Sequence, residues 1–311
     1  MSGVENQSMV PECYMNLRPT AGELLSDLPN YPVTLAVYII VTIATCVLLG
    51  LFFETVYFIG RKLPRSSVPN HRMNILWMVS IYPMFAVISL PGLYIPNAAP
   101  FCNILISLYY TLVLFKFFVL VCDYFGGHRA MMDRLKSEKI MFPLAAAPLL
   151  ACFRCLPQKR LTRRSFRWLK VFALQVAFVR PLMMFVLAIL WLDGLTPGNV
   201  ENDTPFLIIN LIMIVSTLTA MTVLTMLYQA SREELQGYNI GPKFWLVKLG
   251  LIIDNLQSAL LGLFASFRIL GCKIPFPLPV RANQWQCLML IIDACILFPL
   301  YSNITAEKMA T

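Results

Sequence analysis

The chain has 311 residues, of which 58% are hydrophobic and only 13% are charged. Soluble domains contain roughly 45–50% apolar residues, so this composition excludes a soluble globular protein and indicates an integral membrane protein. The formal net charge of +9 does not predict nucleic-acid binding. Lys and Arg are concentrated between the apolar runs, where they set topology and contact anionic membrane lipids.

Residues 1–32 are mostly polar and precede the first apolar run. Within them, Thr20-Ala-Gly-Glu23 has the capping-box pattern, in which the Thr and Glu side chains satisfy backbone N–H groups at the start of a helix. Leu24, Leu25 and Leu28 follow, so we expect a short amphipathic helix at the outer surface. The alternative is a disordered tail that happens to contain leucines.

Seven apolar runs are each long enough to cross a bilayer. About 20 residues at 1.5 Å per residue span the hydrocarbon core as a helix. Backbone polar groups in lipid must be paired within the segment, which favours helices here, since the short alternating strands of a barrel are not seen. We therefore predict an all-α integral membrane protein with seven transmembrane helices, at about residues 33–59, 73–94, 101–125, 169–192, 205–228, 244–270 and 285–302.

The distribution of Lys and Arg between alternate connecting segments predicts the orientation, because basic residues favour the cytoplasmic side. One side carries four of them in residues 60–72, eleven in 126–170, two in 229–243 and one in the tail, which is 18 against the Arg18, Lys273 and Arg281 of the other side. We therefore expect the N-terminus outside and the C-terminus in the cytoplasm.

This orientation divides the chain into an extracellular segment 1–32, a seven-helix transmembrane domain 33–302 and a cytoplasmic tail 303–311. Asn202-Asp203-Thr204 is then a glycosylation acceptor on the outer side, which makes Asn202 the candidate. Four cysteines would also face outside, where one disulfide can form, although the sequence leaves the pairing open: Cys13, Cys102, Cys272 and Cys287.

The basic cytoplasmic loop, residues 126–168, contains two further features. Its apolar stretch Ile140–Phe153 is too short and too proline-broken to cross the bilayer, so we place it at the inner membrane surface. Cys152 and Cys155 lie among basic residues, which suits S-palmitoylation, because an acyl chain and a polybasic patch together give stable anchoring. Inert thiols are one alternative. Metal or redox chemistry is another, but no second cysteine pair or nearby histidine completes a zinc site.

Ionisable side chains inside the predicted spans are costly in lipid and are functional candidates for that reason. Glu54, Asp123 and Lys248 lie near helix ends, where they can extend to the interface or pair with basic loop residues, so we favour a structural role for them. Lys116 lies seven residues before Asp123 and therefore on the same helix face.

Other polar residues lie deeper in the predicted spans. Arg180 precedes Pro181 in the fourth span, and the sixth span is the most polar, with Asp254, Asn255 and Gln257 after Lys248. A pair between Arg180 and Asp254 is one interpretation that the sequence leaves open.

The sequence contains no motif of a known membrane enzyme. His71 and His128 fall in predicted loops, so no intramembrane histidine cluster can hold a catalytic zinc. Asp254 and Asp293 lack the motifs of intramembrane aspartyl proteases. No Gly-rich phosphate loop, serine nucleophile motif or cofactor fingerprint is present. We predict neither catalysis, nor a cofactor, nor a metal site.

A seven-helix receptor is the main alternative, because the predicted topology is that of receptors. The third span ends in Cys122-Asp123-Tyr124, where a rhodopsin-like receptor would show Asp-Arg-Tyr, and Pro299-Leu-Tyr301 in the last span lacks the preceding asparagine. A membrane receptor or a signalling or trafficking scaffold therefore stays the second hypothesis.

A series of short motifs follows in order along most of the chain, from about Thr20 to Asp293. They are Thr20-Ala-Gly-Glu-Leu-Leu25, Phe53-Glu54-Thr-Val-Tyr57, Tyr124-Phe-Gly-Gly127, the Cys152/Cys155 loop, Gln175-Val-Ala-Phe178 with Arg180, Asp193-Gly194, Asn239-Ile-Gly-Pro-Lys-Phe244 and Gln257. Their order and spacing resemble the organic solute transporter alpha subunit family. The chain departs from that family in having two separated cysteines instead of a dense cysteine run, a short tail, and Lys116 at an otherwise apolar position.

The resemblance implies a facilitative transporter subunit for bile acids, steroid conjugates or related organic anions, independent of ATP and of an obligatory ion gradient. It also implies a single-span beta subunit needed for activity and surface delivery. The expected location is the plasma membrane, basolateral in polarised cells, with unassembled chains in the endoplasmic reticulum.

An amphipathic anion needs an apolar groove with a few cationic or amide groups. The substrate-binding candidates of this chemistry are Arg180, Lys248, Asn255, Gln257 and Lys116.

Overall fold

The computed structural model describes residues 20–62, 71–127, 130–131, 141–142, 159–160, 163–193, 203–232, 240–266 and 278–310. Nearly all of these residues are helical, which confirms the predicted all-α class. Cys152, Cys155 and Asn202 lie outside the described residues, as does most of the apolar stretch Ile140–Phe153.

Among the described residues, six helical segments are long and apolar enough to cross a membrane. A seventh crossing forms if α3 (His71–Val79) and α4 (Ile81–Tyr94), which are bent by 45° at their junction, count as one broken span. The other crossings are α2 (Pro32–Lys62), α5 (Ala99–Tyr124), α7 with α8 (Arg163–Leu174 and Val176–Leu192), α9 (Asp203–Ser231), α10 (Ile240–Ser266) and α11 (Leu278–Ala310). The count of seven predicted spans therefore matches these segments one for one.

The fourth crossing begins earlier than the sequence predicts, at Arg163 instead of residue 169. Its first helix, α7, is amphipathic: Phe166 and Ala173 are buried, while Arg164 and Arg167 are exposed. A hydropathy scan ends where such basic residues begin, although the helix continues. The two helices of this crossing, α7 and α8, meet at Gln175. Pro181, which has no N–H to donate, lies inside α8, six residues beyond that junction.

Short elements connect or flank the crossings. Helix α1 (Ala21–Asp27) starts with the expected capping box, in which Glu23 N–H donates to Thr20 Oγ1 at 3.3 Å and Thr20 N–H donates to the Glu23 carboxylate at 2.8 Å. Leu24 is fully buried, so the amphipathic helix predicted from this motif is confirmed. The remaining elements are η1 (Leu28–Asn30), η2 (Pro96–Ala98) and the antiparallel strand pair β1 (Met141–Phe142) and β2 (Lys159–Arg160).

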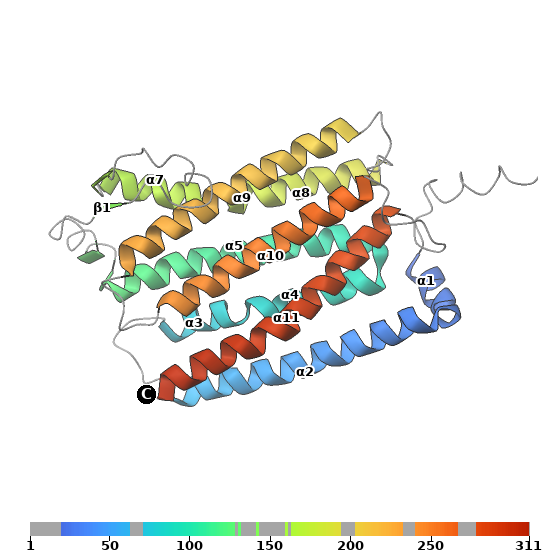
Figure 1. The fold of residues 1–311 in the computed structure, drawn as a ribbon, viewed down its shortest axis with the longest axis horizontal. Helices are drawn as coiled ribbons and strands as arrows, with labels where there is room; N and C mark the ends of the chain where they lie inside the picture. The colour runs from blue at the N-terminus through green and yellow to red at the C-terminus, as the bar shows by residue number, and fades with distance from the viewer. Residues whose placement is uncertain are drawn as a thin grey trace, which may run out of the picture.

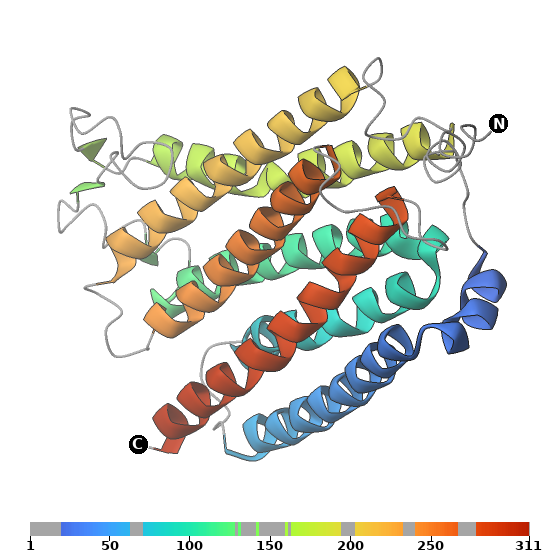
Figure 2. The ribbon, with the colours of Figure 1, turned by 45° about the vertical axis from the view of Figure 1, so that its right-hand side comes forward.

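The crossings run alternately up and down between two ends of one bundle (Figure 1). We call the end that carries α1 the α1 end and the opposite end, where α7 begins and α11 finishes, the α7 end. Helices α4 and α5 lie inside the bundle, while α2, α10 and α11 cover one side of them (Figures 1 and 2).

Two tyrosines fix α10 to the inner helices. Tyr82 of α4 donates its hydroxyl hydrogen to the Leu246 carbonyl at 3.2 Å, and Tyr110 of α5 donates to the Val247 carbonyl at 3.1 Å. Both phenols are buried, where an unpaired hydroxyl would be unfavourable. The two bonds therefore hold consecutive residues of α10 against α4 and α5.

Gly92 of α4 lies close to α5 and α11 near the α1 end. A Cβ atom at this position would lie 2.9 Å from Cys287 Sγ of α11 and 3.3 Å from Cys102 Sγ of α5. Both thiols are buried and free. Only a glycine leaves room for the two sulfur atoms here.

Candidate functional site

Helix α10 supplies the centre of the candidate site, because its polar residues point to three different neighbours. With about 100° of rotation per residue, Lys248 and Asn255 share one face of the helix, whereas Gln257 lies about 180° from Lys248. Asp254 projects between these two directions. The hydrogen bonds described below follow this division: the first face contacts α9, Asp254 contacts α8, and Gln257 contacts α11.

Lys248 is held against α9 without an acidic partner. Its ammonium donates to Thr225 Oγ1 at 3.3 Å and lies 5.3 Å from the ring centroid of Phe244 and 5.1 Å from that of Trp245. It forms no salt bridge within the described residues. A half-buried ammonium that has only a hydroxyl and aromatic faces around it keeps an uncompensated positive charge, which is an attractive position for an anion.

A second polar contact lies on the same face, closer to the α1 end. Thr217 donates its hydroxyl hydrogen to Asn255 Oδ1 at 3.3 Å, and Asn255 Nδ2 donates to the Leu251 carbonyl at 2.6 Å. We call Thr217, Thr225, Lys248 and Asn255 together the α9–α10 seam. Seven residues separate Lys248 from Asn255, so its two contacts lie about 10 Å apart along the helix axis.

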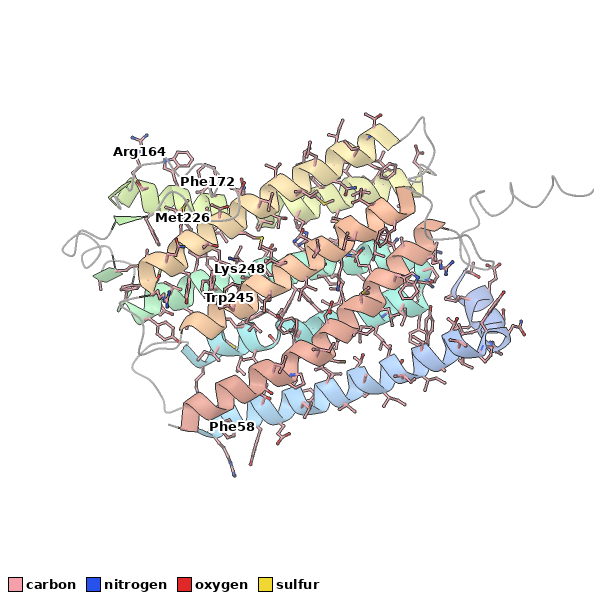
Figure 3. All side chains as sticks on the ribbon, viewed as in Figure 1. Phe58, Arg164, Phe172, Met226, Trp245 and Lys248 are labelled. Atoms are coloured by element: carbon pink, nitrogen blue, oxygen red, sulfur yellow. The ribbon has the colours of Figure 1, made fainter. Side chains whose placement is uncertain are left out.

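The seam is visible from the side in Figure 3. Lys248 of α10 is labelled between α10 and α9, Trp245 is labelled on α10 itself, and Met226 is labelled on α9 (Figure 3). Met226 is buried, whereas Trp245 is 49% exposed at the edge of the bundle. The charged end of the seam is therefore close to the surface that would contact lipid.

A buried ion pair lies beside the seam. Arg180 of α8 donates from Nη2 to the Asp254 carboxylate, and both side chains are almost fully buried. Asp254 lies ten residues from either end of the crossing Phe244–Phe264, which is mid-membrane depth. Arg180 Nε and Nη1 have no hydrogen-bond partner in the described part of the chain. The pair is neutral overall, yet it retains donors that another acceptor can use.

The remaining predicted residues do not join the seam. Gln257 donates from Nε2 to the carboxylate of Asp293 on α11. Lys116 lies on the α5 face shared by Tyr109 and Asp123, and both of these contact the α3–α4 segment: Tyr109 is bonded to Ser80 and Asp123 to Asn74. The α5 face that carries Lys116 is distinct from the face that carries Tyr110, which contacts α10. Glu54 is exposed on α2.

The structure adds residues that sequence reasoning missed. Thr217 and Thr225 have the hydroxyls that complete the seam, and Asn74 binds Asp123 through its amide at 3.2 Å. Threonine is common in apolar helices, so its type alone gave no signal. The spacing of eight residues between Thr217 and Thr225, which places both on one face of α9, could have indicated them.

The described side chains around α10 can bind a polar solute. Within the described residues, no group of three or more His, Cys, Asp or Glu could hold a metal ion. What the seam and the ion pair offer is a cation, an amide, hydroxyls and spare guanidinium donors inside an apolar bundle. Groups of this kind inside crossings are typical of proteins that move polar solutes through membranes.

The architecture and the site thus define a multi-span membrane protein of the solute-transporting class. The sequence model of the family described as "Organic solute transporter Ostalpha" matches residues 37–301. The chain belongs to this organic solute transporter alpha family, and the family resemblance predicted from its motifs is confirmed.

Individual relatives agree with the family assignment. The chain is 27% identical to the organic solute transporter subunit alpha of Danio rerio over 84% of this chain and 78% of that protein. It is 26% identical to the subunit alpha of Homo sapiens over 93% of this chain and 83% of that protein. It is also 24% identical to the organic solute transporter alpha-like protein 2 of Caenorhabditis elegans, over 89% and 79%. No solved structure matches the chain.

Proposed function

We propose that this protein is the alpha subunit of a facilitative transporter that carries bile acids, steroid conjugates or related amphipathic organic anions across the plasma membrane. The observation that carries the proposal is the ammonium of Lys248 in the α9–α10 seam, which has no acidic partner among the described residues. Membership of a family of solute transporters gives the class, and this cation gives the preference for a negatively charged solute.

The seam suits a solute with an apolar body and one charged end. A carboxylate, sulfonate or sulfate can act as the counter-ion of Lys248, which has none among the described residues, and form a charge-assisted hydrogen bond with it. Trp245 and the apolar side chains around it contact the body of the solute, in keeping with the mainly apolar lining of ligand sites. The positive charge of Lys248 then selects for anions, while the apolar contacts accept solutes with a range of carbon skeletons.

A second position for the charged end lies deeper in the membrane. Asn255 and the free donors of Arg180 can hold an anionic group after it leaves Lys248, because amide and guanidinium N–H groups bind oxyanions. Asp254 neutralises most of the Arg180 charge, so this position binds the anion weakly. Weak binding at successive positions suits facilitated diffusion, in which a tightly held solute would not be released.

We further propose that a single-span beta subunit completes the transporter as a heteromer. The relatives from Danio rerio and Homo sapiens are named as alpha subunits, which supports a second subunit. In this proposal the N-terminus is extracellular, Asn202 is glycosylated and Cys152 and Cys155 are acylated at the cytoplasmic surface. The assembled protein resides in the plasma membrane, basolateral in polarised cells, and unassembled chains stay in the endoplasmic reticulum.

Uptake of a labelled organic anion tests the proposal. Radiolabelled taurocholate and estrone sulfate are supplied to cells that express the chain with and without a candidate beta subunit, and surface abundance is measured by biotinylation. We expect saturable uptake that depends on both chains and is unaffected by depletion of ATP. Surface expression without uptake in any pairing would contradict the transport function.

A further inference from the structure

We infer that the Gln257–Asp293 pair between α10 and α11 is the docking point for a partner's transmembrane helix that carries a lysine or arginine near the middle of its span. The inference rests on the proposed function only in that an alpha subunit requires a second subunit. It names a surface and a recognition chemistry that the transport site does not use.

The pair has acceptor oxygens left over. Gln257 Nε2 donates to one oxygen of the Asp293 carboxylate, and Gln257 Oε1 is buried without a hydrogen-bond partner in the described part of the chain. Asp293 forms no salt bridge within the described residues. The second carboxylate oxygen of Asp293 and the amide oxygen of Gln257 are therefore acceptors that suit the donor-only chemistry of a lysine or arginine side chain.

The depth of the pair requires a partner inside the membrane. Gln257 lies seven residues from the nearer end of the crossing Phe244–Phe264, and Asp293 lies seven residues from the nearer end of Val280–Leu300. Seven residues of helix correspond to about 10 Å. Water is scarce at that depth, so an ionised carboxylate needs a counter-ion that also resides in the membrane.

The surface around the pair is accessible to another helix. Helices α10 and α11 lie side by side at the front of the bundle in Figures 1 and 2, with no described helix in front of them. Asp293 and Gln257 lie at the inner edges of two outward apolar stripes, which consist of Leu256 and Leu260 on α10 and Met289, Ile292 and Ile296 on α11. A partner helix laid along these stripes would bring its central side chain to the half-buried carboxylate of Asp293, and it would reach the buried Gln257 Oε1 only after the Gln257 side chain turns outward.

A small cation is a poorer occupant than a basic side chain. Hard cations take about six or more oxygen ligands, whereas the identified acceptors here are the carboxylate and Gln257 Oε1. A single ammonium or guanidinium, in contrast, is satisfied by two or three acceptors, with its aliphatic stem in contact with the apolar stripes. The charge and the geometry of the pair therefore favour the basic residue of a helix.

Binding of model helices to the full chain tests the inference. The purified protein is placed in phosphatidylcholine nanodiscs and titrated with fluorescent single-span poly-leucine peptides that carry Lys, Leu or Asp at the central position. We expect the Lys peptide to bind the unsubstituted chain about tenfold more tightly than the Leu peptide, the size expected for about 1.4 kcal/mol from a charged hydrogen bond in a membrane. Asp293→Asn should abolish this preference.

Matched variants separate docking from misfolding. Glu54→Gln removes another intramembrane acid, on α2, and should leave the preference for Lys unchanged. Asp293→Lys should reverse the preference toward the Asp peptide, a gain that a misfolded protein cannot show. Equal binding of the Lys and Leu peptides by the unsubstituted chain, or a loss with Glu54→Gln as large as with Asp293→Asn, would overturn the inference.

The outcome is independent of transport. Peptide binding is measured without solute, so binding that depends on Asp293 together with absent anion uptake supports the docking point and contradicts the transport function. Anion uptake together with binding that ignores Asp293 contradicts the docking point alone.

Discussion

Arg180 of α8 and Asp254 of α10 form an ion pair at the centre of the membrane, 74 residues apart in the chain. The pair connects α8 to α10, the helix that forms one side of the α9–α10 seam. Its burial makes it sensitive to the loss of either partner, and Arg180 Nε and Nη1 have no hydrogen-bond partner in the described part of the chain.

Removing one partner of this pair should destabilise the protein more than removing both. Arg180→Met or Asp254→Leu alone leaves an uncompensated buried charge, which costs about 3–5 kcal/mol, whereas the double variant leaves none. Thermal unfolding in detergent, followed by tryptophan fluorescence, should show the double variant close to the unsubstituted protein and both single variants far below it. Additive losses in the double variant would contradict a direct pair.

The same double variant separates stability from transport. If Arg180 also holds the anion, uptake should fall in the double variant even when its unfolding temperature is restored. Normal uptake by a stable double variant would confine Arg180 to a structural role.

Lys248 should determine the affinity for anions. Lys248→Gln removes the positive charge but keeps a hydrogen-bond donor for Thr225, so we expect the fold to persist and the KM for estrone sulfate to rise about tenfold, which corresponds to about 1.4 kcal/mol. Lys248→Arg should retain most of the affinity. The measurement is concentration-dependent uptake corrected for surface abundance.

Lys116→Gln is the matched control for this prediction. It removes a lysine from another crossing, on the α5 face that contacts α3 and not the seam. We expect its KM to change less than twofold, about 0.4 kcal/mol. An equal effect of the two substitutions would show that the anion is not recognised by the seam.

Gly92 should tolerate no side chain. Gly92→Ala places a Cβ 2.9 Å from Cys287 Sγ and 3.3 Å from Cys102 Sγ, and overpacking of this kind costs about 1–3 kcal/mol. Adding Cys287→Gly removes the closest sulfur and should recover part of the stability lost to the overlap. In contrast, Gly250→Ala meets only Ile81 Cγ2 at 3.7 Å, an ordinary contact, so its unfolding temperature should not fall.

Acylation of the two cysteines in the basic loop can be tested by chemical labelling. Replacing Cys152 and Cys155 with serine should lower labelling by acyl-biotin exchange, because no thioester can form there, and should lower surface delivery as well. Cys46→Ser on α2 is the control. Unchanged labelling of the double variant would place any acylation at other cysteines.

Sequence patterns predicted the crossings well, because membrane thickness imposes a length and an apolarity that can be read along the chain. The motif Thr20 to Glu23 also gave α1 correctly, since a capping box is a local interaction. The bend between α3 and α4 was not predicted. Ser80 at that bend bonds Trp77 and Tyr109, and the latter contact depends on how distant segments pack.

The candidate site was only partly predictable for the same reason. Polar residues in apolar helices can be found in the sequence, which is how Lys248, Asn255 and Arg180 became candidates. Their partners cannot be found that way, because hydropathy contains no distance between helices. In the structure, Lys248 and Asn255 contact two threonines of α9. Gln257 contacts α11 instead, and Lys116 lies on the α5 face that contacts α3.

The two tyrosine bonds to α10 set a limit on how the transporter can move. Tyr82 and Tyr110 hold consecutive carbonyls of that helix, and a slip of one residue would displace both acceptors by about 1.5 Å and 100°. The rotational register of α10, and with it the direction of Lys248, is therefore fixed relative to α4 and α5. We expect α9 to be the moving wall of the seam, so spin labels on α9 should change their distance to α5 during turnover while labels on α10 keep theirs.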